Sequence, residues 1–217
     1  MDRRLALAIF RAITAAIVIV AILVQVRLNL DSGLFRPLRF FALFTVLSYV
    51  FAAVVWLWLA LRWRAARTWG DDLLRGASVL YLVLSLVIVV VLVVGPEFQV
   101  GDPRVDLIVR KVFPVLAAVD WLIDPPATDL RMRDVGLWLI FPVVWLAFSL
   151  IRGAVDDWYP YRFLDPGPAG YRSVAYHAVA LLAALLVIAG GIVALGDFGR
   201  DRRLRRGSME RALTSHP

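Results

Sequence analysis

The sequence predicts an all-α protein: a polytopic bundle of six transmembrane helices with both the N-terminus and the C-terminus in the cytoplasm. Of its 217 residues, 61% are hydrophobic and 19% are charged, whereas a soluble domain is about half apolar and a quarter charged. The apolar residues gather in six stretches that approach the roughly 20 residues needed to cross a bilayer as a helix. The arginines between these stretches are divided unequally, as is typical of membrane proteins.

Each apolar stretch predicts one span. The predicted spans are residues 5–26, 40–61, 77–94, 105–123, 135–151 and 174–195. They make up one transmembrane domain, residues 1–199, followed by a basic tail, residues 200–217. The first stretch is too long for a secretory signal core and no small-residue cleavage site follows it, so we expect a retained helix. The fourth contains four charged residues, and we expect neighbouring helices to shelter it.

The distribution of arginine predicts the orientation. With the N-terminus inside, the cytoplasmic segments carry 14 arginines and the opposite segments carry seven, which fits the positive-inside rule. Arginine supplies 23 of the 24 cationic residues, a bias typical of GC-rich bacterial genomes. We therefore expect a multi-pass protein of the bacterial plasma (inner) membrane. Because the arginines stand between apolar runs and form no patch on a polar domain, we expect no nucleic-acid binding.

The composition also limits the chemistry. The chain has no cysteine, which excludes disulfides, thiolate nucleophiles and cysteine metal sites. Its two histidines, His177 and His216, are isolated in the sequence and cannot form a metal cluster of the usual kind. There is no phosphate-binding glycine loop, nucleophile elbow or redox-cofactor motif. We expect neither a metal nor a cofactor.

Charged residues of the fourth span share one narrow face. At the helical period, Asp106, Arg110 and Asp120 fall close together, and the first two are four residues apart, the spacing of a helical ion pair. Pro114 leaves the Arg110 carbonyl without its usual partner, so we expect a kink or an extra polar contact there. This face is either a binding or catalytic site or a structural pair that holds the bundle together.

Hydroxyl groups gather on one face of the second span, which carries Thr45, Ser48 and Tyr49. Thr45 is a candidate nucleophile, but a hydroxyl is inert until a base removes its proton. In membrane helices, such hydroxyls more often bond to the preceding turn or to a neighbouring helix. His177, at the start of the last span, is a candidate base, although an isolated histidine is more often a hydrogen-bonded structural residue.

Several segments, in order along nearly the whole chain, resemble the bacterial Pr-six-Pr family of membrane proteins. The segments are RFFALFTVLS at 39–48, FPV at 113–115 with Asp120 and Trp121, RD at 133–134 with Trp138 and Pro142, IRGA at 151–154, WYPY at 158–161, FLD at 163–165 and GY at 170–171. That family is distantly similar to the androgen-induced FAR-seventeen-a family, six-span enzymes that hydrolyse fatty acid esters of hydroxy fatty acids with a threonine and a histidine.

The resemblance implies that Thr45 is the family threonine. The position of the bacterial family's histidine, four residues before the proline of the fourth span, is occupied by Arg110, and a family asparagine is replaced by Tyr49. A protonated arginine cannot act as a general base, although it can hold a carboxylate or an oxyanion. If the threonine mechanism operates, Thr45 must be activated by His177, Asp106 or Asp120.

Three functions remain open on the sequence. The first is an intramembrane threonine-type lipid-ester hydrolase, and the second is a non-catalytic lipid-binding protein in which Arg110 grips a fatty-acyl carboxylate. The third is a small-solute transporter whose polar face lines a pathway. All three involve membrane lipids as surroundings or ligands, and the oligomeric state is open. The candidate residues are Thr45 and His177 for catalysis and Arg110, Asp106, Asp120, Ser48 and Tyr49 for binding.

Overall fold

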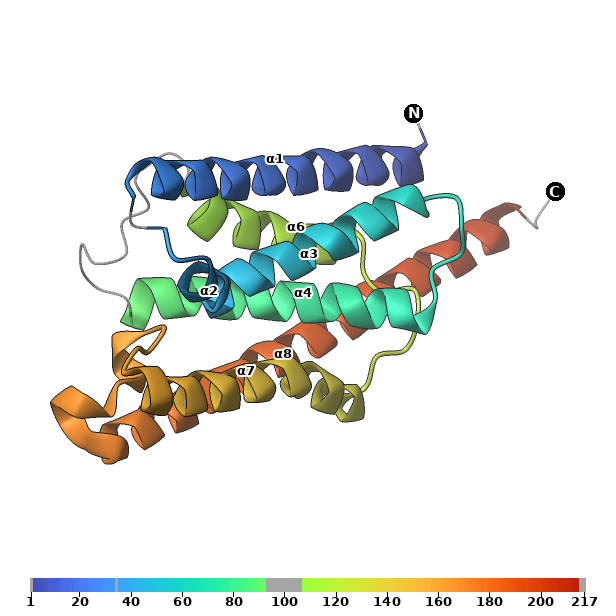
Figure 1. The fold of residues 1–217 in the computed structure, drawn as a ribbon. Helices are drawn as coiled ribbons and strands as arrows, with labels where there is room; N and C mark the ends of the chain where they lie inside the picture. Colours follow the sequence, from blue (N-terminus) through green and yellow to red (C-terminus); the bar gives the residue numbers. More distant parts are fainter. Residues whose placement is uncertain (1, 34, 93–106, 215–217) are drawn as a thin grey trace.

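The computed structural model describes residues 2–33, 35–92 and 107–214. Within these residues every regular element is a helix, as the sequence predicts. The long elements are α1 (Arg3–Asp31), α3 (Phe44–Leu61), α4 (Trp69–Val87), α6 (Phe113–Ile123), α7 (Val135–Asp156) and α8 (Pro166–Thr214), shown in Figure 1. The short ones are α2 (Pro37–Phe41), π-helical turns at Ile88–Leu92 and Ile108–Val112, and 3-10 turns at Met132–Asp134 and Arg162–Leu164.

Five helices are long and apolar enough to cross a membrane. They are Arg3–Asp31, Phe44–Leu61, Trp69–Leu92, Met132–Asp156 and Gly170–Arg205. These helices correspond to the first, second, third, fifth and sixth predicted spans, and their number fits a multi-pass membrane protein. The predicted fourth span corresponds to a shorter element, the π-helical turn Ile108–Val112 followed by α6.

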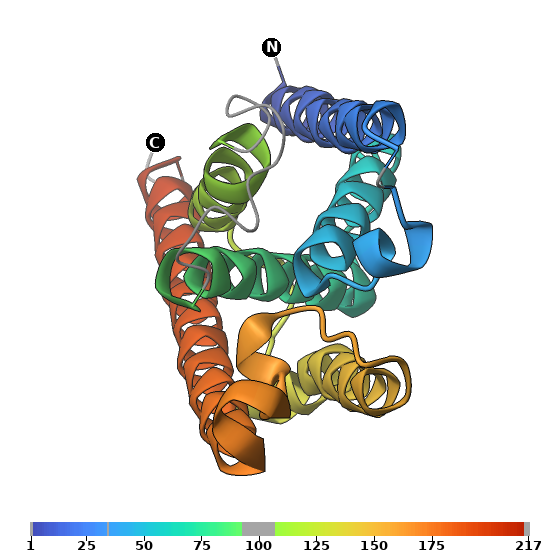
Figure 2. The same cartoon turned by 60° about the vertical axis from the view of Figure 1, so that its left-hand side comes forward.

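Helix α4 is the centre of the arrangement. It contacts α3, α6 and α8 and is the most buried of the five long apolar helices. Figure 2 shows α1, α3 and α6 on one side of α4 and α7 on the other, with α8 along one edge. Both chain termini lie at the same end of the bundle (Figure 1). We call this end the terminal end, and the end that holds α2 the opposite end.

Local chemistry explains where several elements begin and bend. Asp2 caps α1 by accepting a hydrogen bond from the Arg4 N–H over 3.0 Å, and Thr68 and Asp71 cap α4 reciprocally, which satisfies N–H groups that a helix start leaves unpaired. The π-helical turn Ile108–Val112 ends two residues before Pro114. A proline removes a backbone donor, and a π-helical turn is a common way to accommodate such an interruption.

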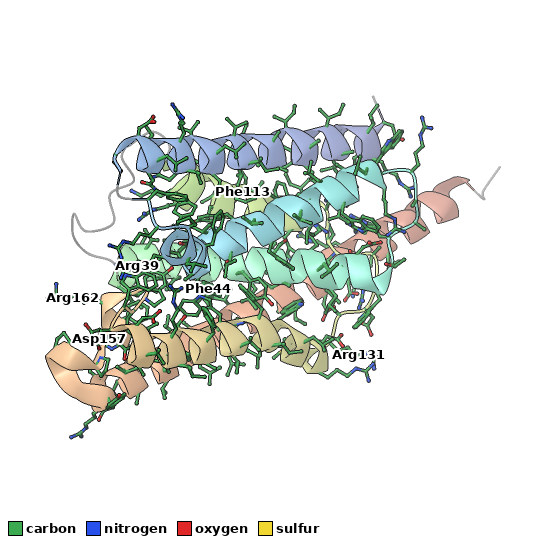
Figure 3. All side chains as sticks on the ribbon, in the orientation of Figure 1. Arg39, Phe44, Phe113, Arg131, Asp157 and Arg162 are labelled. Atoms are coloured by element: carbon green, nitrogen blue, oxygen red, sulfur yellow. The ribbon has the colours of Figure 1, made fainter. Side chains whose placement is uncertain are left out.

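Aromatic rings fill the interior. Phe44 contacts Phe141 with ring centroids 5.4 Å apart and Trp145 at 5.2 Å, and the Tyr81 phenol donates a hydrogen bond to the Trp138 carbonyl over 2.8 Å. Figure 3 shows the side chains on the ribbon, with Arg131 at the terminal end and Arg39, Asp157 and Arg162 at the opposite end. The two ends are therefore polar and the middle is apolar.

Residues 200–214 continue α8 as a helix, where the sequence suggests only a basic tail. The continuation is held to the bundle, because Arg200 Nη1 lies 2.8 Å from Asp129 Oδ1. Hydrogen bonds from Arg131 and Arg200 hold the pKa of Asp129 below its usual value. The start of the basic segment is thus part of the folded unit.

Candidate functional site

Thr45 lies in the first turn of α3 and is 9% exposed. Its polar contact comes from Tyr161, in the connection between α7 and α8. The Tyr161 phenol donates a hydrogen bond to Thr45 Oγ1 over 3.4 Å and accepts one from the Thr45 N–H over 3.2 Å. Because the first N–H groups of a helix lack intrahelical partners, Tyr161 caps α3 and contacts the candidate nucleophile at once.

Tyr161 is placed as a donor to Thr45. Burial raises the pKa of the phenol, and the bonds to Thr45 and the nearby charge of Arg110 oppose this only in part. The phenol is therefore protonated at neutral pH and cannot take the threonine proton. Arg110 is half-buried in the π-helical turn. Thr45, selected from the sequence, thus contacts Tyr161, and the charge of Arg110, also selected, lowers the pKa of the same phenol, which burial raises.

His177 is held elsewhere. Its Nδ1 lies 2.8 Å from the Ser173 carbonyl oxygen, one turn earlier in α8. Its ring stacks on Phe163, with centroids 5.7 Å apart, and Phe163 in turn stacks on Tyr161 at 5.2 Å. A general base must reach its proton directly or through one water, whereas His177 is linked to Thr45 only through two aromatic rings in series.

The remaining candidates on the second and fourth spans occupy different surroundings. Ser48 is fully buried, and its Oγ has no hydrogen-bond partner among the described residues. Tyr49 is 2% exposed and its ring centroid lies 6.3 Å from that of Phe113. Asp106 lies outside the described residues. Asp120 is 1% exposed at the far end of α6, where it belongs to a separate set of charges.

Asp120 binds two arginines from other helices. Arg11 of α1 approaches both carboxylate oxygens, with Nε 2.9 Å from Oδ1 and Nη2 3.2 Å from Oδ2. Arg75 of α4 places its Nε 2.8 Å from Oδ2. The Arg75 side chain is fully buried, and its guanidinium also lies 4.9 Å from the centroid of the Trp121 ring. Each charge therefore has a partner of opposite charge inside the bundle, which a buried ion requires.

Asp124 extends this arrangement toward the terminal end. Its carboxylate lies 2.8 Å from Arg11 Nη2, 2.6 Å from Arg67 Nη1 and 3.1 Å from Arg203 Nη2. Burial alone would raise the pKa of Asp124, but Arg75, Arg67 and Arg11 together hold it well below its usual value. We call these charges the ion network: Arg11, Arg67, Arg75, Arg203, Asp120 and Asp124.

Asp72 fastens the connection after α6 to the network. Its Oδ2 accepts hydrogen bonds from the N–H groups of Ala127 and Thr128, over 2.7 and 2.9 Å, and from the Thr128 hydroxyl over 3.0 Å. Its Oδ1 lies 3.3 Å from Arg67 Nε, close enough for an ion pair although not aligned for a hydrogen bond. The connection and the arginine are thereby fixed together.

A cavity of about 440 Å³ opens beside the ion network. We call it the basic cavity. Its charged lining is Arg3, Arg4, Arg11, Arg62, Arg67 and Arg203, with Asp2, Asp71 and Asp124, and its apolar lining includes Leu7, Ala8, Leu59 and Trp63. The first turns of α1, the end of α3, the connection to α4 with the start of α4, the end of α6 and α8 contribute these residues. Six guanidinium groups thus face three carboxylates beside an apolar wall.

The ion network is only partly visible in the sequence. Arg11 interrupts an otherwise apolar stretch, which is costly without a partner and therefore indicates a buried acid nearby. Arg75 lies in a segment that the sequence predicts to be cytoplasmic, yet its side chain is fully buried. Asp124 follows the predicted fourth span and carries no pattern of its own. Periodicity within one helix cannot show which residues of other helices meet Asp120.

The described residues 2–33, 35–92 and 107–214 contain no group of three acidic, histidine or cysteine side chains that could hold a metal ion. Comparisons with protein-family models, with curated proteins and with solved structures find no match to this chain.

Proposed function

We propose that this protein spans the membrane six times, with both ends in the cytoplasm, and binds the anionic head group of an acyl lipid in the basic cavity. The observation that carries the proposal is the lining of that cavity, with six arginines against three aspartates. Guanidinium groups pair with carboxylates and phosphates through two parallel hydrogen bonds. An excess of them beside an apolar wall suits a ligand that is charged at one end and apolar at the other.

The size and rigidity of the cavity support a head-group site. Its volume of about 440 Å³ is within the range of small-molecule pockets, roughly 300–1,000 Å³. Asp124 holds Arg11, Arg67 and Arg203 in fixed positions, so little side-chain freedom is lost when a ligand binds. Arg4 also lines the cavity and is exposed, with no carboxylate partner among the described residues, which leaves it available to an anion.

The proposed orientation supports the same conclusion. The terminal end would face the cytoplasm, where the arginine excess lies and where anionic lipids concentrate positive side chains at the membrane surface. In this proposal, the π-helical turn and α6 supply the fourth crossing, so that the chain crosses an even number of times. A reporter enzyme fused after the last residue should be active only in the cytoplasm; activity outside the cell would refute this orientation.

Oleate binding tests the basic cavity. The purified protein would be mixed with oleate or with the uncharged oleyl alcohol, and bound ligand counted by native mass spectrometry. Arg4→Gln should weaken oleate binding about tenfold, the effect of losing one charge-assisted hydrogen bond of about 1.5 kcal/mol, and leave oleyl alcohol unaffected. Arg64→Gln is the matched control, because Arg64 is exposed at the same end and does not line the cavity. Equal binding by the two variants would refute the site.

A second candidate, a threonine-type lipid-ester hydrolase of the Pr-six-Pr type, is favoured by the contact between Thr45 and Tyr161. A protonated phenol beside the nucleophile could stabilise an oxyanion, but the mechanism also needs a base, and His177 contacts Ser173 and Phe163 instead. A fluorophosphonate probe should label the protein if it is such an enzyme, and Thr45→Ala should then abolish the label. If the probe does not label the protein and Arg110→Ala weakens oleate binding, the acyl carboxylate binds beside Arg110 instead.

A further inference from the structure

A second basic cavity lies at the opposite end of the bundle. It has a volume of about 550 Å³, and its lining includes Arg36, Arg39, Arg152, Asp156 and Leu38. The residues come from α2, from the chain just before it and from the last turns of α7. Arg39 is labelled at this end in Figure 3. We call this the outer cavity, and it shares no residue with the basic cavity.

Two of its arginines converge on one indole ring. The guanidinium carbons of Arg39 and Arg152 lie 5.2 and 5.3 Å from the centroid of Trp158, distances at which a cation is attracted to an aromatic face. Arg152 is further fixed, because its Nη1 donates to the Leu38 carbonyl over 3.0 Å and its Nε lies 3.2 Å from Asp156 Oδ2. Trp158 and Leu38 therefore hold two positive groups close together.

The charges of the outer cavity are not balanced from within. Three arginines face one aspartate, and that aspartate is paired with Arg152. Arg36 and Arg39 have no carboxylate partner in the part of the chain that the structure describes. Like charges held near one another repel, so the arrangement becomes more stable when an anion binds between them.

The surroundings of the outer cavity indicate a lipid as the source of the anion. Leu38 is 75% exposed and the neighbouring Phe41 is 44% exposed, on a short helix at the edge of the bundle. Exposed apolar side chains beside arginines are typical of the membrane interface, where the apolar part enters lipid and the charged part meets head groups. A free anion in water would gain nothing from this apolar edge.

We propose that the outer cavity binds the phosphate of an anionic phospholipid in the leaflet opposite to that of the basic cavity. Arg36 and Arg39 contact the phosphate, Trp158 positions Arg39, and Leu38 and Phe41 lie against the acyl chains. This site is independent of the basic cavity, because different residues form it.

Lipid binding to a paired set of variants tests this inference. Dioctanoyl phosphatidylglycerol, dioctanoyl phosphatidylcholine and inorganic phosphate would each be titrated into the detergent-solubilised protein, with bound molecules counted by native mass spectrometry. The Arg36 side chain is exposed and makes no hydrogen bond among the described residues. Arg36→Gln should weaken phosphatidylglycerol binding about tenfold. The double variant, Arg36→Gln with Arg39→Gln, should remove one bound lipid. Arg27→Gln is the control, since Arg27 is exposed at the same end with its side chain 75% accessible and lies outside the cavity.

Each outcome of these titrations supports or overturns the outer lipid site. Loss of phosphatidylglycerol in the Arg36 variants, with no loss in Arg27→Gln, supports a separate outer lipid site, and a further loss in Arg4→Gln then reports on the basic cavity alone. Equal binding by the Arg36 and Arg27 variants overturns it. Inorganic phosphate that competes with phosphatidylglycerol at equal concentration overturns the lipid as the source. A loss only in Arg4→Gln leaves the basic cavity as the lipid site and refutes the outer one.

Discussion

At the scale of single residues, Asp120 has the largest predicted effect on stability. It is 1% exposed and pairs with both Arg11 and Arg75. Replacing it by alanine leaves the Arg75 guanidinium without its carboxylate inside the bundle and Arg11 with Asp124 alone, and breaking a buried pair costs about 3–5 kcal/mol. Asp120→Ala should therefore unfold at a much lower temperature in detergent, as circular dichroism can measure.

The matched control for Asp120 is an exposed pair. Arg27 and Asp31 form an ion pair with side chains 75% and 56% exposed, and such pairs contribute about 0–1 kcal/mol. Asp31→Ala should thus melt within a few degrees of the wild type. If Asp120→Ala melted with it, the buried ion network would have no role in stability.

The sequence indicates which α6 residues are buried, but it does not indicate which residues of other helices pair with them. The helical period also places Phe113 and Ala117 on the face of Asp120, and all three are at most 1% exposed. The cost of a charge in lipid also indicates that Asp120 needs a partner. The partners Arg11 and Arg75 lie 109 and 45 residues away along the chain, and only the packing of three helices brings them together.

At the scale of elements, a close approach between α4 and α7 depends on Gly76. A Cβ added there would overlap the indole of Trp138, whose Nε1 donates to the Leu73 carbonyl over 2.9 Å. Gly76→Ala should lower the free energy of unfolding by about 1–3 kcal/mol, as overpacking does. Gly136→Ala is the control, because a Cβ at that α7 position meets no atom within 4 Å. Equal melting temperatures for the two variants would contradict the close packing.

The length of α4 shows what hydropathy misses. The predicted third span begins at residue 77, whereas α4 begins at Trp69. The two additional turns contain Asp72 and Arg75, which an apolar window excludes, yet both are fully buried. They remain helical and buried because Thr128 and Asp120 satisfy them. Thr68 and Asp71 cap this helix start reciprocally, and the structure shows that the span extends to them.

At the scale of the whole molecule, Asp124 joins the parts of the terminal end. Arg11 of α1, Arg67 of the connection before α4 and Arg203 of α8 all contact its carboxylate. These segments are far apart in the sequence, so one side chain restrains three of them relative to α6. The restraint exists only while the carboxylate is ionised, which makes the stability of the terminal end dependent on pH.

The sign of that dependence follows from the lowered pKa of Asp124, which burial opposes and Arg75, Arg67 and Arg11 produce. The unfolded chain binds a proton at Asp124 more tightly than the folded chain does, since an aspartate in an unfolded chain has a pKa of about 3.9. The contribution of Asp124 to stability is therefore complete above about pH 5 and is lost as the pH falls through 4 toward the folded pKa. We expect the melting temperature in detergent to be steady from about pH 8 to 5 and to fall below about pH 4.

Asp124→Asn isolates this effect from the titration of the other carboxylates. The amide keeps the shape of the side chain but carries no charge, so the variant should melt below the wild type at neutral pH. The gap between the two proteins should narrow as the pH falls below about 4, because protons then bind Asp124 in the unfolded wild-type chain and stabilise that chain relative to the folded one. A gap that stays constant down to about pH 3, where an ordinary aspartate is largely protonated, would mean that the arginines do not draw their stabilising effect from the charge of Asp124.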